Sequence, residues 1–397
     1  MEALHVACLS EAEQEGRFES VPCTYHSIET FEHGQACYQI CTEEPEKVGR
    51  SSLAATFSER LPTRPPGPHV VATSSPARTG LFRCLFQGSR PEHVSGRSDS
   101  LPFRDKHSLQ SFFRDFDLPL SYLQIADGSL GVAHAQTTTD GSKRTTKYTF
   151  IAHCTFKRGD WAMALSHDRT RKCTSLFWSV DNRVNVRSIT QNLEHLKEFA
   201  FHPVLAPCIM FNELLRVALE RRRAIKKKIA ILEETVGRLT MSTSPWSHNR
   251  TVSTSGLQDI EHLIKLLNSC RSEQISREGR YHLWTSVHNA IQVGFAYAEK
   301  ALDHVPQPVF LKAHCELQDW TALSWRRLES LIARDVDHVS RVDNVSNTLY
   351  NLIHQRDSRI QLEIARASQR DSEDMKFLAL LGSVFLPAGL IAVSAWS

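Results

Sequence analysis

The sequence lacks the short motifs that mark many enzymes. It has no glycine-rich phosphate loop, no Gly-x-Ser-x-Gly nucleophile turn and no His-Glu-x-x-His metal motif. Its ten cysteines are dispersed, and none forms the Cys-x-x-Cys pair that zinc and redox sites usually show. We therefore predict reduced cytosolic thiols, no enzymatic activity and no cofactor.

The sequence also lacks an excess of charge of one sign. Its 47 Lys and Arg against 44 Asp and Glu give a formal net charge of +3, too even to indicate a nucleic-acid partner. The densest basic run, residues 220–228, is interrupted by apolar residues at helical spacing, which favours a solvated helix face. Contact with anionic lipid, or with opposite charges in an assembly, is the alternative for this run.

A secretory signal is missing as well, because no basic flank followed by an apolar run opens the chain. Residues 1–79 contain acidic, Ser, Pro and Gly residues and the proline-rich stretch LPTRPPGP, so we predict a disordered arm and linker. Residues 80–186 are predicted to form a small cytoplasmic α/β domain. Three of its segments, residues 147–156, 161–166 and 174–180, read as antiparallel strands.

Helical periodicity begins after Ile189 and continues through the rest of the chain. We predict a helical region over residues 187–308, with helices at 208–240, 257–270 and 280–302. Residues 309–381 contain no Pro and no Gly, and their apolar positions recur about every 3.6 residues. The prediction is one stalk helix over residues 309–376, in a segment about 110 Å long up to Leu381. Such a helix needs packing partners, either earlier helices or other copies of the chain as in a coiled coil.

The only long uncharged run lies at residues 377–396, FLALLGSVFLPAGLIAVSAW. Twenty such residues match the length that crosses about 30 Å of hydrocarbon, so we predict a transmembrane helix. Arg366, Arg370 and Lys376 precede the run and place the bulk of a single-pass membrane protein in the cytosol. The predicted fold class is therefore α+β and mostly helical: a small N-terminal α/β domain, then a helical bundle whose very long stalk helix continues into the transmembrane helix.

Three segments near the C-terminus resemble a known family: residues 350–357 (YNLIHQRD), 371–376 (DSEDMK) and 384–388 (VFLPA). They are similar to the CorA-like magnesium transporters of filamentous fungi, over about the last 60 residues most specifically. The resemblance implies a pentamer in the lipid bilayer whose stalk helices continue into pore-lining helices. It also implies passage of magnesium or another divalent cation, which is cargo and regulator rather than cofactor. Carried over by position, Ser383, Pro387 and Ser394 are the candidate pore-facing residues.

Members of that family follow the pore helix with a Gly-Met-Asn signature and a second transmembrane helix, whereas the sequence stops at Ser397. Two alternatives therefore accompany transport: a non-conducting, membrane-anchored interaction protein, or an incomplete gene model that lacks the second helix. Regulatory metal ligands stay unassigned. The carboxylates available along the stalk are Asp335, Asp337, Asp343, Asp357, Glu363 and Glu373.

Overall fold

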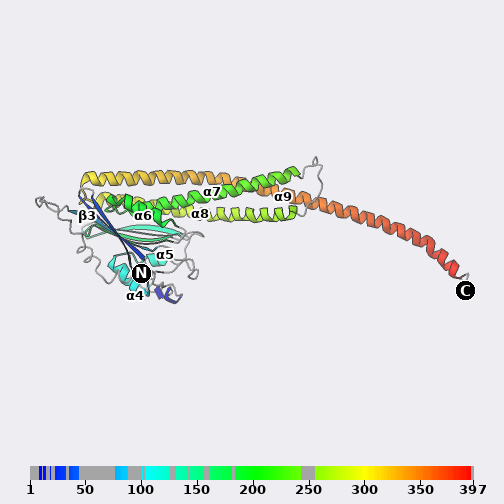
Figure 1. Cartoon of the computed structure of the whole chain (residues 1–397), viewed down its shortest axis with the longest axis horizontal. Coiled ribbons are helices and arrows are strands. Elements are labelled where there is room, and N and C mark those ends of the chain that lie inside the picture. Colours follow the sequence, from blue (N-terminus) through cyan, green and yellow to red (C-terminus); the bar gives the residue numbers. More distant parts are fainter. Residues whose placement is uncertain are drawn as a thin grey trace. The chain divides into compact units, whose positions relative to one another are not determined.

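The computed structural model describes the chain in segments between Leu9 and Ser394 (Figure 1). The described residues are 9–10, 12–14, 18, 23–32, 35–43, 77–87, 101, 103–125, 131–141, 144–154, 161–180, 184–242 and 255–394. Their contacts define two compact units. Unit 1 consists of residues 1–222 and 275–333, and unit 2 consists of residues 223–274 and 334–397.

Unit 1 is built around a seven-stranded sheet of order β2-β1-β3-β7-β6-β5-β4. Neighbouring strands are antiparallel except β3 and β7, which run parallel. The strands are β1 (Cys23–Phe31), β2 (Ala36–Glu43), β3 (Arg78–Gln87), β4 (Val132–Thr139), β5 (Thr145–Cys154), β6 (Trp161–Asp168) and β7 (Cys173–Val180).

One face of the sheet carries a cluster of aromatic residues around the short helices α4 (Lys106–Asp115) and α5 (Tyr122–Ile125). Helix α4 begins at Asp105, whose carboxylate accepts a hydrogen bond from the backbone N–H of Ser108 at 2.7 Å. Phe112 and Phe113 of α4 then pack on Phe177 of β7. Aromatic side chains therefore cover the apolar part of this face.

The opposite face is covered by helices, as Figure 1 shows. They are α6 (Val186–His195), the 3-10 turn η1 (Lys197–Phe199) and the parts of three long helices that belong to unit 1. The long helices are α7 (Leu205–Ser242), α8 (Ser255–Ala301) and α9 (Gln307–Ser394). Gly294 of α8 permits a close approach, because a Cβ there would lie 2.3 Å from Cγ1 of Val204 and 2.8 Å from the Tyr148 hydroxyl.

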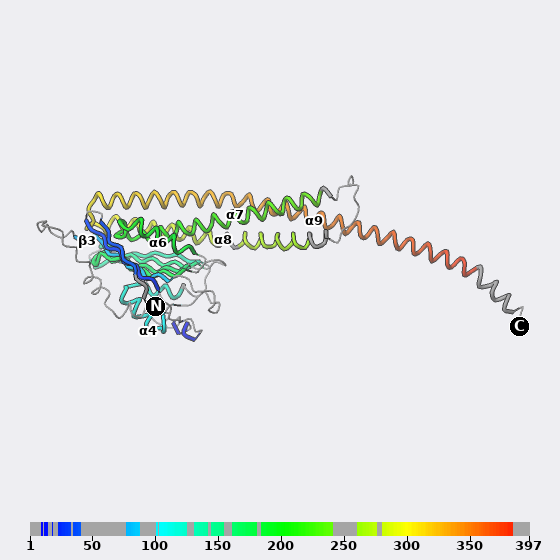
Figure 2. Tube along the Cα trace, viewed as in Figure 1, coloured from blue at the N-terminus to red at the C-terminus, as the bar shows by residue number. Residues whose placement is uncertain are grey.

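Unit 2 contains the remaining parts of α7, α8 and α9, which Figure 2 traces side by side along the first part of the unit. Their shared core includes Ile229 of α7, Leu267 of α8 and Val342 of α9. Ion pairs flank it: Arg341 donates two hydrogen bonds to Glu233, at 2.8 and 2.5 Å, and Lys228 pairs with Glu273 at 2.8 Å. The three segments therefore form a helical bundle of their own.

Several sequence-based predictions are confirmed. The fold is mixed α+β with long C-terminal helices, and β5, β6 and β7 match the three predicted antiparallel strands within two residues at each end. Helix α7 matches the prediction for residues 208–240, and α9 matches the uninterrupted stalk helix. Ile225 and Ile229 are buried while Arg223, Lys226 and Lys227 are exposed, which confirms the solvated face of the basic run.

The prediction of a disordered arm over residues 1–79 is wrong for the part that the structure describes. There, β1 and β2 form a hairpin, and β1 also pairs with β3. Strand β1 could not be recognised in the sequence, because this strand buries the polar residues His26, Ser27 and Thr30 beside Tyr25 and Ile28. Residues 44–76 lie outside the described part of the chain. A second correction concerns residues 257–302, where the structure has one helix, α8, instead of two, because the polar stretch between the predicted helices continues the helical backbone.

The division into units also differs from the predicted boundaries at 186 and 308. Residues of α7, α8 and α9 complete the hydrophobic core on one face of the sheet, so unit 1 includes helical segments far along the sequence. Periodicity identifies such helices, but it carries no information about which half of each helix packs on the sheet.

Candidate functional site

The strongest candidate for a functional region is the C-terminal part of α9. The helix is 88 residues long, about 130 Å, and it begins at Gln307 with Pro308 in the first turn, where no intrahelical N–H bond is lost. Between residues 309 and 381 no Pro or Gly interrupts it. The backbone of α9 stays helical to Ser394, within the predicted membrane segment.

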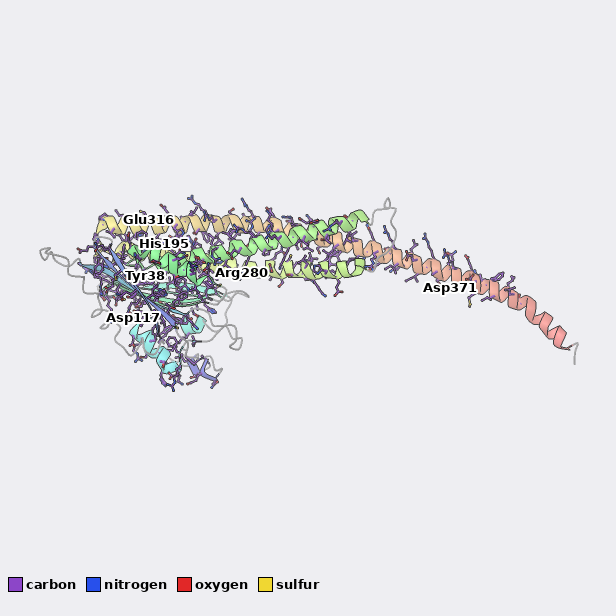
Figure 3. All side chains as sticks on the ribbon, viewed as in Figure 1. Tyr38, Asp117, His195, Arg280, Glu316 and Asp371 are labelled. Atoms are coloured by element: carbon purple, nitrogen blue, oxygen red, sulfur yellow. The ribbon has the colours of Figure 1, made fainter. Side chains whose placement is uncertain are left out.

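Within unit 2, α9 is packed at first and then fully exposed. Val342, Val345 and Leu349 are buried against α7 and α8. From residue 357 to residue 380 every side chain is exposed, and the region around Asp371 in Figure 3 shows them projecting from a single helix. We call residues 357–380 the stem. Most helical stability in proteins comes from packing of an apolar face, and the stem has no such packing within the described residues.

Apolar residues interrupt the charged surface of the stem. Ile360 is 42% exposed and Ile364 is 64% exposed, and their spacing of four residues puts them on one helix face. Ile353, seven residues before Ile360, lies on the same face and is half-buried. The positions 353, 360 and 364, with steps of seven and four residues, have the spacing of the apolar residues that helices bury against each other in a coiled coil. We call these three positions the seam.

The predicted basic residues Arg366, Arg370 and Lys376 all lie in the stem and are exposed. Among the described residues none of the three takes part in an ion pair. Of the candidate pore-facing residues, the hydroxyl of Ser383 donates a hydrogen bond to the Leu380 carbonyl at 2.8 Å. The side chains of Pro387 and Ser394 lie outside the described part, although both positions belong to the helical backbone.

The stalk carboxylates do not gather into a metal site. Asp343 pairs with Arg271 at 3.5 Å, and Asp335 lies 3.6 Å from the ring of His338. Glu373 accepts a hydrogen bond from Gln369 at 3.2 Å. Within the described residues, no three His, Cys, Asp or Glu side chains are arranged to hold a metal ion.

Among the described residues, no helix has an apolar stretch long enough to cross a bilayer. The structure describes the side chains of the predicted transmembrane segment, residues 377–396, only as far as Ser383.

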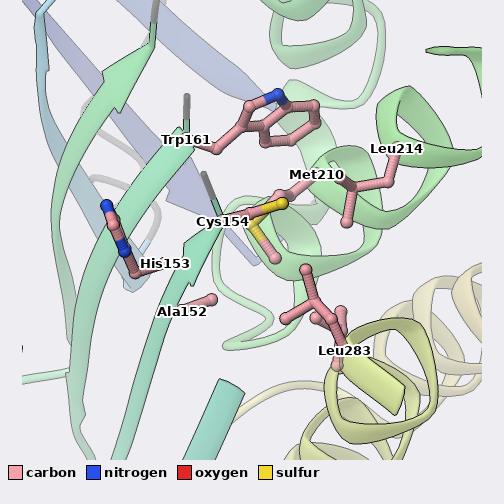
Figure 4. A pocket seen from close by; sticks show the side chains of 8 residues that line it. Ala152, His153, Cys154, Trp161, Met210, Leu214 and Leu283 are labelled. Carbon is pink, nitrogen blue, oxygen red and sulfur yellow. The ribbon is translucent and has the colours of Figure 1, made fainter. Parts of the chain in front are cut away.

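Unit 1 contains one small cavity of note between the sheet and the helices (Figure 4). It is lined by Ala152, His153, Cys154, Trp161, Met210, Leu214, Leu283 and Val287. The labelled side chains of Trp161, Met210 and Leu283 converge on it from β6, α7 and α8. Its walls are largely apolar, so we interpret the cavity as a small gap in the packing of the core.

Buried histidines are the feature of unit 1 that sequence reasoning missed. His26 and His167 each have one ring nitrogen bonded, to the Tyr38 hydroxyl at 2.7 Å and to the Thr174 hydroxyl at 2.8 Å. Burial lowers the pKa of His26 to about 4 and that of His167 to about 3, because a charged ring loses hydration there. The residues that surround them come from distant segments, so no local spacing could have indicated the burial.

Comparison with known proteins gives no further assignment: no known protein family matches the chain, and no functionally characterised protein does either.

Proposed function

We propose that this chain is a membrane-anchored protein that self-associates through the stem of α9 and allows divalent cations, magnesium foremost, to cross the membrane. The observation that carries the proposal is the continuous helix α9, whose exposed stem leads into an uncharged apolar segment. A helix exposed on all sides has no reason to persist as a monomer in water. Copies of the chain packed along Ile360 and Ile364 supply the missing contacts.

The sequence of residues 377–396 supports the anchoring step. It has no charged residue, and the basic residues Arg366, Arg370 and Lys376 precede it, as expected for a segment whose stem side faces the cytosol. Gly382 and Gly389 provide small positions at which neighbouring helices can approach closely.

The spacing of Ser383, Pro387 and Ser394 supports a pore. Steps of four and seven residues bring the three positions to one face of a helix. In a ring of helices such a face lines the axis, where hydroxyls and a carbonyl freed by Pro387 offer oxygen atoms to a hydrated cation. The resemblance of residues 350–357, 371–376 and 384–388 to CorA-like magnesium transporters favours magnesium as the ion.

The test uses the full chain reconstituted in vesicles of zwitterionic and anionic phospholipid. Expected results are resistance to carbonate extraction, a discrete oligomer after crosslinking, and magnesium influx reported by an entrapped dye. The double substitution Leu386→Arg with Leu390→Arg adds about 5–7 kcal/mol to insertion and should release the protein from the membrane. The matched control is Gln361→Arg in the stem, which should remain inserted.

The outcomes separate the alternatives. Carbonate extraction of the wild-type chain would refute the membrane proposal altogether. Stable insertion and self-association without magnesium influx would refute transport and leave a membrane-anchored interaction protein.

A further inference from the structure

A row of polar residues crosses the sheet of unit 1 on the face that carries α4. Directly opposed residues of neighbouring strands point to the same face, so the register defines the row. Its members are Gln39, Ser27, Arg83, Ser175, Ser166, Thr149 and Gln136. The next row on the same face, two residues along each strand, is apolar and includes Leu85, Ala164 and Phe177. A polar band inside an otherwise aromatic layer therefore needs an explanation.

Arg83 lies at the centre of this row. Its Nη2 donates a hydrogen bond to the Ser175 hydroxyl at 2.8 Å, and its guanidinium lies 4.5 Å from the centre of the Phe116 ring. Its Nε is buried and has no hydrogen-bond acceptor among the described residues. In the described part of the chain no carboxylate pairs with Arg83. The guanidinium is always charged, and the face of the Phe116 ring offsets that charge only in part.

The carboxylates described on this face are already engaged. Glu29, diagonal to Arg83 across β1 and β3, pairs with Arg78 at 3.5 Å. Asp117, next to Phe116, accepts a hydrogen bond from Lys147 at 2.7 Å. Asp168 accepts bonds from the backbone and hydroxyl of Thr170 at 2.7 and 2.6 Å. None of the three is available to neutralise Arg83 without breaking these contacts.

Ser166 supplies a second, independent observation. Its side chain is only 3% exposed, and its hydroxyl has no hydrogen-bond partner within the part of the chain that the structure describes. Ser166 is directly opposite Ser175, which already contacts Arg83. A buried hydroxyl without a partner costs about 1–3 kcal/mol, so the position is expected to have a partner in the functional protein.

We propose that Arg83, Ser175 and Ser166 form a binding site for an oxyanion, the phosphate or carboxylate group of a small molecule. The site offers several N–H and O–H donors around one positive charge. Within its described residues, no unpaired carboxylate competes for these donors. A planar guanidinium presents two parallel N–H groups that match the two oxygens of such a group. The Ser166 hydroxyl donates a third hydrogen bond, and the aromatic layer limits competition from water.

The probe is inorganic phosphate, with sodium acetate as the carboxylate arm and sodium chloride at equal ionic strength as the reference. Thermal unfolding of the full chain in detergent should show a saturable rise in melting temperature with phosphate or acetate and none with chloride. A response to phosphate alone or acetate alone identifies which oxyanion class binds. Equal melting temperatures in all three salts would overturn the proposal.

Two variants test the residues. Ser166→Ala removes a hydroxyl that has no partner, so a purely structural role predicts unchanged or higher stability without ligand. A ligand role also predicts roughly tenfold weaker binding of the oxyanion, the worth of one hydrogen bond to a charged group. Arg83→Lys keeps the charge and loses the paired N–H groups, so it should weaken binding by a similar factor.

The control is Arg144→Gln, which removes an exposed arginine just before β5 in the same unit. It should leave the response to the oxyanion unchanged. Unchanged oxyanion affinity in Ser166→Ala and in Arg83→Lys would show that the polar row serves the fold alone.

Discussion

The Nε2 atom of His202 and the Nδ1 atom of His314 lie 3.3 Å apart within a cluster of aromatic rings. Phe295 and Phe310 flank the pair, with ring centres 5.7 and 6.3 Å from that of His202. Among the described residues, Glu299 brings a negative charge near, 3.4 Å from Nε2 of His314. One shared proton satisfies this contact, whereas a charged His202 ring would lose its hydration.

The pair makes unit 1 sensitive to acid. Burial, reinforced by His314 and His167, lowers the pKa of His202 well below its usual 6.5. Below pH 6.5 the unfolded chain then binds more protons than the folded chain, so stability present above that pH is lost as pH falls. Each such histidine contributes up to about 1.4 kcal/mol per pH unit. Unfolding of the wild-type chain between pH 7.5 and pH 5 should show this decline.

The substitution His202→Phe isolates the contribution of His202. A phenyl ring suits the aromatic surroundings and cannot be protonated, so the free energy of unfolding should depend less steeply on pH. His195→Gln serves as the control because His195 is exposed on α6. An identical pH profile for His202→Phe and wild type would contradict the assignment.

The close approach at Gly294 gives a second prediction. Gly294→Ala puts a Cβ within 2.3 Å of Val204 and should destabilise the chain by about 1–3 kcal/mol through overpacking. Gly237→Ala in α7 is the matched change, since no atom lies within 4 Å of its added Cβ. It should stabilise the helix by up to about 1 kcal/mol. Chemical denaturation of both variants measures the contrast.

The bundle of unit 2 gives a third prediction from two isoleucines on one helix. Ile229 of α7 is fully buried, whereas Ile231 is 54% exposed. Ile229→Ala removes packed methyl groups and should lower the free energy of unfolding by about 2–5 kcal/mol. Ile231→Ala should change it by less than about 0.5 kcal/mol. Equal effects in denaturant unfolding would mean that the bundle packs differently.

The sequence predicts elements best where one signal dominates. The absence of Pro and Gly across residues 309–381 correctly indicates α9, and the aromatic and β-branched residues of β5 to β7 correctly indicate strands. The signal fails for β1, where His26 and Thr30 are buried through hydrogen bonds to Tyr38 and Gly80. A polar residue that finds a buried partner in another strand looks, in the sequence alone, like a surface residue.

The candidate site shows the same division. Exposure of the stem follows from its many charged residues, and its apolar seam can be read from the spacing of Ile353, Ile360 and Ile364. The alignment of Arg83 with Ser175 and Ser166 cannot be read in this way, because it joins strands about 90 residues apart and depends on the register of a parallel pair.

The seam on the stem gives the last prediction. Ile360 and Ile364 are exposed in the single chain, so replacing both with Ala should leave its unfolding unchanged, and Ala favours the helix. If copies associate along this face, each buried Ile contributes about 1.5–3 kcal/mol, and the double variant should associate at least tenfold more weakly. Leu362→Ala is the control, because Leu362 is 51% exposed and lies on the opposite face. Sedimentation in detergent measures the association; equal weakening by the control would mean that general hydrophobicity, and not this seam, holds the copies together.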